Sequence, residues 1–242
     1  MNDVIRQMTD RKSVRVFTDR EIAPEEKNAI LVSAVMAPTA GNQQLYTIID
    51  VTDEEKKQAL CESCDHQEFI KDAKLVLVFA ADCKKWYDAY LASGSFPRAP
   101  GAGDLMLAVT DAAIAAQNAV NAAWSLGIGS CYIGDIMENC EMQREILSLP
   151  KYVFPCVMLV FGFPTEQQKR REKPKRADLK HIVHENGYRE MDEEELREMF
   201  SKRAGEKGFD EWMKAFCLRK YNSDFSREMT RSVDKYLSDF QR

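Results

Sequence analysis

No glycine-rich dinucleotide fingerprint follows a predicted strand in this sequence, so we do not expect a Rossmann fold. The N-terminal segment carries no apolar core of a secretion signal. The most apolar stretch, residues 105–126, contains Asp111 and several amide side chains, which would be costly in lipid. We therefore predict a buried helix in this stretch and no membrane span.

The charge balance and the cysteines narrow the class of protein further. Lys and Arg number 34 against 39 Asp and Glu, and the resulting formal charge of −5 argues against a dedicated nucleic-acid binder. The seven cysteines lack the spacing of a disulfide scaffold, which in a chain of 242 residues favours reduced thiols and a cytoplasmic location. Cys61 and Cys64 form a CxxC pair at the end of a predicted helix, without a second pair of ligands, so we expect no metal site.

The predicted elements are helices mixed with a few strands, not the regular alternation of βαβ units. Residues 75–81 are a continuous apolar run, the pattern of a strand that is buried on both faces. Residues 104–126 form a long alanine-rich helix, whose small side chains allow another helix to pack close. The other predicted elements are helices at 2–9, 24–36 and 137–147 and strands at 46–51 and 156–161.

The composition changes after residue 163. Residues 169–176 are strongly basic, and residues 192–204 form a charged helix that begins with a capping box. Residues 223–241 form an amphipathic helix with large apolar side chains at helical spacing. Such a helix covers either the chain's own core or a partner subunit, and we favour the partner.

Two basic stretches are candidates for binding an anion. Arg11, Lys12, Ser13 and Arg15 place three cations and a hydroxyl group within five residues, and in an extended segment residues 11, 13 and 15 point the same way. Guanidinium and hydroxyl groups in such a row suit a phosphate, although a solvated basic turn is the alternative. The second stretch, Lys169–Arg176, taken alone predicts a solvated loop or a nucleic-acid patch.

Several motifs in order along the chain resemble the nitroreductase family of FMN enzymes. They are Arg11-x-Ser13-x-Arg15-x-Phe17, then Pro38-Thr39-Ala40-Gly41-Asn42-Gln43-Gln44, then Tyr132-Ile133-Gly134. The later segments Lys173-Pro174-Lys175 and Val183-His184-Glu185-Asn186-Gly187-Tyr188 resemble one subgroup, the larger oxygen-insensitive NADPH nitroreductases and NAD(P)H:flavin oxidoreductases.

The resemblance implies an α+β fold in which a central, mostly antiparallel sheet is flanked by helices, in an intertwined homodimer with FMN at its interface. It implies a nitroreductase core at residues 1–165. Residues 166–242 would then be a C-terminal extension of the same structural domain, which completes the phosphate site and wraps the partner subunit.

The resemblance also assigns site residues. Those expected to hold the phosphate and polar edge of FMN are Arg11, Lys12, Ser13, Arg15, Lys173 and Lys175, with Arg15 stabilising the reduced flavin electrostatically. Thr39 and Gln67 match positions beside the ribityl chain and ring, and Tyr132, Ile133, Gly134 and Asp135 match the segment that lines the ring. Arg203 and Lys207 are the candidates for the 2′-phosphate of NADPH, because Gly208 stands where the subgroup has a second arginine.

The activity implied by the resemblance is a ping-pong transfer of two electrons from NADPH or NADH, through FMN, to a nitroaromatic, quinone, azo or flavin acceptor. The flavin carries the chemistry, so no catalytic side chain is expected. A dedicated NAD(P)H:flavin reductase remains an alternative, as does an anion- or nucleic-acid-binding protein that uses Lys169–Arg176. We expect small-molecule partners and a second copy of the chain, and neither nucleic acid nor membrane.

Overall fold

The computed structural model describes residues 1–241, which form two compact units. The first unit comprises residues 1–171 and the chain from Glu228 onward, and the second comprises Glu172–Arg227. The boundary that the sequence predicts at residue 165 therefore lies inside the first unit. The chain from Glu228 onward also belongs to this unit. Wrapping of a partner subunit by the extension stays a prediction.

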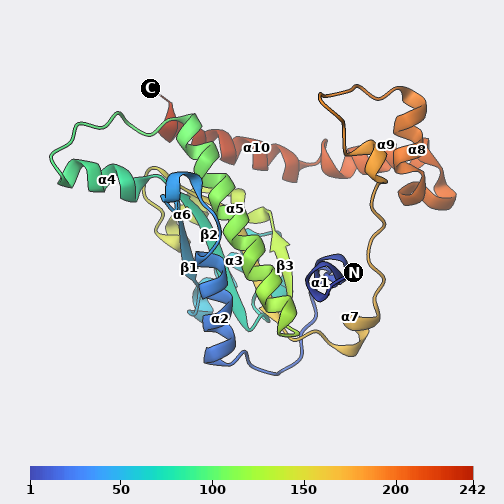
Figure 1. Ribbon diagram of the computed structural model, residues 1–242, viewed down its shortest axis with the longest axis horizontal. Coiled ribbons are helices and arrows are strands. Elements are labelled where there is room, and N and C mark those ends of the chain that lie inside the picture. Colours follow the sequence, from blue (N-terminus) through green and yellow to red (C-terminus); the bar gives the residue numbers. More distant parts are fainter. Residues whose placement is uncertain (242) are drawn as a thin grey trace. The chain divides into compact units, whose positions relative to one another are not determined.

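A four-stranded antiparallel sheet lies at the centre of the first unit (Figure 1). Its strands are β1 (Tyr46–Asp50), β2 (Leu75–Asp82), β3 (Gly129–Ile133) and β4 (Val153–Gly162), in the spatial order β1-β2-β4-β3. All three neighbouring pairs are antiparallel, which confirms the predicted antiparallel sheet. Every residue of β2 is buried, as the apolar run predicted, because both faces of this strand are covered.

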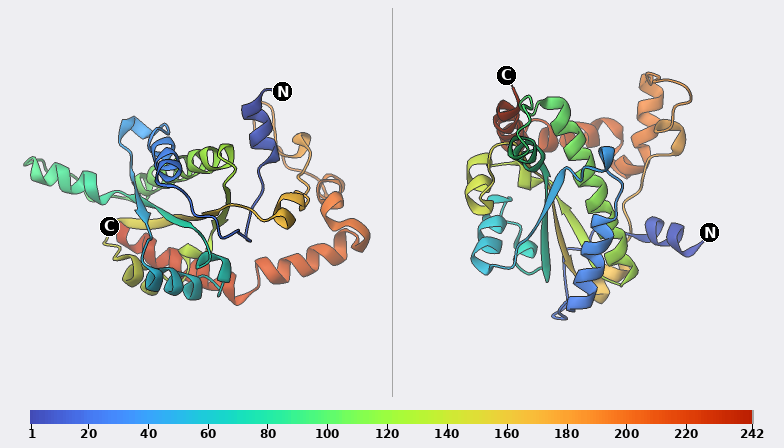
Figure 2. Two further views of the ribbon diagram at one scale, coloured as in Figure 1. Left: turned by 90° about the horizontal axis from the view of Figure 1, so that it is seen from below. Right: turned by 60° about the vertical axis from the view of Figure 1, so that its left-hand side comes forward.

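Helices cover both faces of the sheet (Figures 1 and 2). On one face lie α2 (Pro24–Val35) and α5 (Ala102–Ser125), and on the other lie α3 (Glu54–Ser63) and α6 (Cys140–Leu147). The remaining helices of this unit are α1 (Asp3–Asp10), α4 (Lys84–Ala92), α7 (Glu166–Arg170) and most of α10 (Asp224–Leu237). The second unit contains α8 (Glu193–Ala204) and α9 (Phe209–Lys220).

The alanine-rich helix α5 is buried along one side, as predicted. Its buried residues recur every three or four positions, which is the spacing of one helix face. Because most of them are alanine, α2 and the sheet approach it closely. Among residues 1–241, no helix is both long enough and apolar enough to cross a membrane.

The last turns of α10 pack on the chain's own core. Tyr236 is 1% exposed, and its ring meets that of Phe154 edge-on at 5.0 Å. Phe240 is also buried, with its ring 5.6 Å from that of Tyr152. The part of the amphipathic tail that reaches Tyr236 and Phe240 therefore has an apolar partner within its own chain, and not only the partner subunit that the sequence favoured.

Two facing glycines allow the N-terminal segment to lie across the edge of the sheet. Gly129 of β3 pairs with Gly162 of β4. A Cβ added at Gly129 would lie 2.7 Å from the Cβ of Val14, and one added at Gly162 would lie 2.6 Å from the ring of Phe17. Real side chains do not approach this closely, so both positions require glycine.

Gly129→Ala is expected to destabilise the protein by about 1–3 kcal/mol, because the added methyl group overpacks against the buried Val14. The matched control is Gly103→Ala near the start of α5, where an added Cβ meets nothing within 4 Å. Urea unfolding followed by circular dichroism would measure both. Equal midpoints for the two variants would contradict the close packing of Val14 on Gly129.

Candidate functional site

The segment that follows α1 is held in an extended conformation against the sheet. Ser13 forms a parallel bridge with Ser130, and the Val14 N–H donates to the Ser130 carbonyl at 3.0 Å. The Arg15 N–H donates to the side-chain oxygen of Gln168 at 3.2 Å. Val14 points into the protein, so residues 13 and 15 are directed to the other side, as the alternation of an extended segment requires.

Arg11, Ser13 and Arg15 surround one buried thiol. Burial raises the pKa of Cys131, whereas Arg15, Ser13 and Arg11 each lower it. Such effects on a thiol act only from nearby, and the bridge between Ser13 and Ser130 places this segment beside β3. We call Arg11, Ser13 and Arg15 the cationic cradle.

Lys12 joins this segment to the second basic stretch. Its ammonium group donates to the backbone carbonyls of Lys169 at 2.7 Å and of Arg171 at 2.5 Å. These carbonyls lie at the C-terminal end of α7, where a helix leaves its carbonyl groups without internal partners. Two of the three ammonium hydrogens of Lys12 are therefore bonded within the protein, and its contact with a phosphate stays a prediction.

Arg11 has a donor that the protein does not satisfy. Its Nη1 is buried and has no hydrogen-bond partner within residues 1–241. An unpaired buried donor is costly, and an anion that accepts from it removes this cost. The cradle therefore fits a phosphate group such as that of FMN.

A buried aspartate positions the loop that contains Thr39. The Asp111 carboxylate accepts from the Ala40 N–H at 2.9 Å and from the Leu45 N–H at 3.2 Å. Thr39 accepts from the Gln44 N–H through its hydroxyl oxygen at 3.2 Å. Sequence analysis used Asp111 only as an argument against a membrane span. A carboxylate within a buried alanine-rich helix was the available signal that it binds backbone amides.

The segment expected to line a flavin ring runs from β3 into a short turn. Tyr132 is the outward-facing residue of β3, and its hydroxyl donates to the side-chain oxygen of Gln117 at 3.1 Å. Ile133 is buried in the core, so only its backbone is available to a ligand. Gly134 is exposed, and Asp135 begins the 3-10 turn Asp135–Met137.

Gln67 lies in the loop after α3, where its side-chain N–H donates to the Cys64 carbonyl at 2.9 Å. The neighbouring Phe69 ring lies 5.8 Å from the Arg15 guanidinium carbon, which places the loop beside the cradle. The loop that contains Gln67 therefore lies near Arg15, and the contact of Gln67 with a flavin stays a prediction.

The other expected site residues belong to the second unit. Lys173 and Lys175 lie in its exposed first residues. Arg203, near the end of α8, stacks on the rings of Trp212 at 5.2 Å and of Phe216 at 5.4 Å. Lys207 follows in the short turn Gly205–Lys207. Their roles in binding stay predictions.

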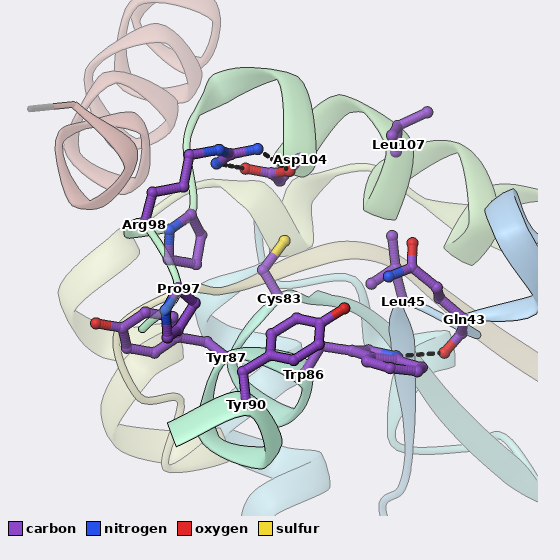
Figure 3. Close-up of a pocket in the computed structure, with 11 residues that line it drawn as sticks. Gln43, Leu45, Cys83, Trp86, Tyr87, Tyr90, Pro97, Arg98, Asp104 and Leu107 are labelled. Atoms are coloured by element: carbon purple, nitrogen blue, oxygen red, sulfur yellow. Dashed lines mark hydrogen bonds and ion pairs between the residues drawn. The ribbon is translucent and has the colours of Figure 1, made fainter. Parts of the chain in front are cut away.

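A cavity of about 290 Å³ lies beside α4 (Figure 3). Its walls include the rings of Trp86 and Tyr90, whose centroids are 5.7 Å apart. The Trp86 indole N–H donates to the Gln43 carbonyl at 2.7 Å, and Arg98 binds both carboxylate oxygens of Asp104. Aromatic walls with a few polar groups suit a flat organic molecule. Sequence reasoning missed this cavity, because its residues come from three separate segments.

Comparisons with known proteins agree with this fold. The family model described as "Nitroreductase family" matches residues 8–163. The FMN reductase [NAD(P)H] of Bacillus subtilis is 32% identical over 238 residues, which cover 98% of this chain and 91% of that protein. The oxygen-insensitive NADPH nitroreductase of Salmonella typhimurium is 32% identical over 219 residues, covering 88% of each chain.

Among solved structures, that of NfrA2 from B. megaterium superposes with a TM-score of 0.83 at 30% sequence identity, covering 100% of both chains. The family model spans the strands, the cradle and the ring-lining segment described above. By these matches, the chain belongs to the nitroreductase family.

Proposed function

We propose that this protein is an FMN-dependent oxidoreductase that passes two electrons from NADPH or NADH to small organic acceptors. The observation that carries the proposal is the cationic cradle, in which the buried Nη1 of Arg11 has no hydrogen-bond partner in the part of the chain that the structure describes. Its relatives of known name include FMN reductases and an NADPH nitroreductase.

When bound, FMN would supply the redox chemistry by accepting a hydride and passing on two electrons. The protein's own groups bind and orient it. Arg11 and Ser13 would hold the phosphate and polar edge, together with Lys173 and Lys175. Arg15 would face the ring's electron-rich edge, where a fixed positive charge stabilises negative charge without reorganisation.

The acceptor is expected to be a nitroaromatic, a quinone, an azo compound or free flavin. A dedicated flavin reductase is the second candidate, because two of the named relatives are FMN reductases. Steady-state turnover with NADPH and NADH against a nitrofuran, a quinone and FMN tests both candidates. Activity with FMN alone would favour the second, and absence of bound flavin and of turnover would refute both.

We also propose that the protein works in the cytoplasm as a homodimer with FMN at the interface. Six of its seven cysteines are buried free thiols, which suits a reducing compartment. Exposed apolar side chains lie on α1, α2 and α5, and α5 adjoins both of the other helices in the first unit. Large exposed apolar residues on neighbouring helices are typical of a protein interface.

Arg11→Ala is expected to weaken FMN binding by about tenfold to a hundredfold, because it removes a charge-assisted hydrogen bond worth roughly 1.5–3 kcal/mol. Flavin fluorescence titration of the flavin-free protein measures the affinity. Lys84→Ala is the control, since Lys84 lies on α4, away from the cradle and the proposed interface, and pairs with Asp88 at 2.7 Å. An unchanged affinity in Arg11→Ala would exclude Arg11 from the phosphate site.

Arg203→Ala is expected to lower kcat/KM for NADPH and to leave that for NADH nearly unchanged. The Arg203 guanidinium lies on two aromatic rings and has no carboxylate partner among residues 1–241, so it is available to the 2′-phosphate. Losing that contact would cost about 1.5–3 kcal/mol. Arg203→Lys keeps the positive charge without the planar guanidinium group and tests whether charge alone suffices. Equal losses with both nucleotides would show that Arg203 does not read the 2′-phosphate.

Val32→Glu is expected to weaken the dimer, because Val32 of α2 is 51% exposed in the single chain and would be covered by the partner. Sedimentation velocity at several protein concentrations measures the change. Met142→Glu is the control, since Met142 is 49% exposed and belongs to α6, which lies on the other face of the sheet from α2 (Figure 1). A monomeric wild-type protein, or identical behaviour of the two variants, would overturn the proposed interface.

A further inference from the structure

A buried carboxyl group lies in the turn that follows β3. Glu138 comes directly after the 3-10 turn Asp135–Met137, and its N–H donates to the Asp135 carbonyl at 3.0 Å. The residue is only 6% exposed, and its Oε1 has no hydrogen-bond partner within residues 1–241. An ionised carboxylate in such a place is unfavourable, so a proton on Glu138 stabilises the fold.

The charged groups around Glu138 are acidic. Burial, followed by the charges of Asp135, Asp65 and Glu228, raises the pKa of Glu138 to about 7. These three carboxylates come from three places: the same turn, the loop after α3, and α10. Glu138 therefore changes its charge near neutral pH.

The other titratable groups nearby do not compensate for this change. Glu228 stays ionised, because Arg231 lowers its pKa to about 2. Arg231 is itself shared between Glu228 and Glu141. The Cys64 thiol stays neutral, because burial raises its pKa to about 12.

The residues directly after Glu138 are fixed by hydrogen bonds, so Glu138 itself stays in place when it becomes charged. The Asn139 N–H donates to Glu228 at 3.1 Å, and its side-chain amide donates to the Ser63 carbonyl at 2.8 Å. The Cys140 N–H donates to the Ser232 hydroxyl at 2.9 Å. Repulsion from an ionised Glu138 therefore acts on Asp135 in the turn and on Asp65 in the adjoining loop.

We propose that Glu138 is a positioning residue of the flavin site: protonated and uncharged, it lets the Asp135 turn and the Asp65–Gln67 loop pack against it, and ionised, it repels the carboxylates of both segments. The inference rests on the proposed function, which places Gln67 and Asp135 beside the flavin. Glu138 itself is buried and acts through these two segments.

The first test is the pH dependence of stability in the flavin-free protein. The pKa of Glu138 lies above its ordinary value of 4.5, so its contribution to stability is complete below that value and is lost as the pH rises through about 7. Glu138→Gln does not ionise. The melting temperature of the wild type should therefore fall relative to that of Glu138→Gln between about pH 5 and about pH 8. Parallel curves would overturn the proposal.

The second test is the pH dependence of FMN affinity, measured by fluorescence titration. The FMN phosphate has a pKa of about 6 and titrates with both proteins, so their difference isolates Glu138. Affinity should fall severalfold more in the wild type than in Glu138→Gln as the pH rises through about 7. Glu145→Gln, on the exposed side of α6, should retain the wild-type profile.

The outcomes separate the two proposals. If none of the proteins binds FMN, the proposed function fails. If all bind FMN and the Glu138→Gln profile matches that of the wild type, the function survives and the role of Glu138 is refuted. A purely structural role would change the melting curves and leave the pH profile of FMN affinity the same in both proteins, which also refutes positioning.

Discussion

The packing of residues 14–17 on two paired glycines is the constraint on which the candidate site depends. Gly129 and Gly162 face each other at the edge of the sheet and leave room for Val14 and Phe17. With these two side chains seated, the backbone between them is fixed in register with β3. The direction of the cationic cradle follows from this fit, because successive side chains of an extended segment point to opposite sides.

The sequence predicted the elements whose signal is local. The apolar run of β2, the alanine spacing of α5 and the alternation of Arg11, Ser13 and Arg15 each lie within a few residues, and the structure has all three. The motif resemblance supplied the family. Contacts between distant segments carried no such signal. Lys12 meets carbonyls 157 and 159 residues away, and Asp111 binds amides 66 and 71 residues away.

The amphipathic helix α10 shows a second limit of prediction from the sequence. The amphipathic spacing in α10 correctly indicated a covered apolar side, but periodicity does not say which surface covers it. Tyr236 and Phe240 are buried by Phe154 and Tyr152 of the same chain. Only the three-dimensional arrangement distinguishes this packing from an intersubunit contact.

Positively charged side chains lie near Cys131, and acidic side chains surround Glu138 a few residues further along the chain. Arg11 and Arg15 act on Cys131, whereas Asp135 and Glu138 follow within a few residues, together with Asp65 and Glu228. An anionic ligand in the cradle is therefore attracted at one end and repelled at the other. This charge separation favours one orientation of the ligand over its reverse.

The paired glycines also restrict how the length of this chain can change during evolution. Inserting one residue within β3 would turn Cys131 and Ile133 outward and Tyr132 inward, because side chains alternate along a strand. If the strand instead shifted toward its start, Gly129 would move away from Val14 and a side chain would stand in its place. Insertions and deletions should therefore accumulate in the exposed stretch between α4 and α5, which is not part of the sheet, while the number of residues from Gly129 to Gly134 stays constant across descendants.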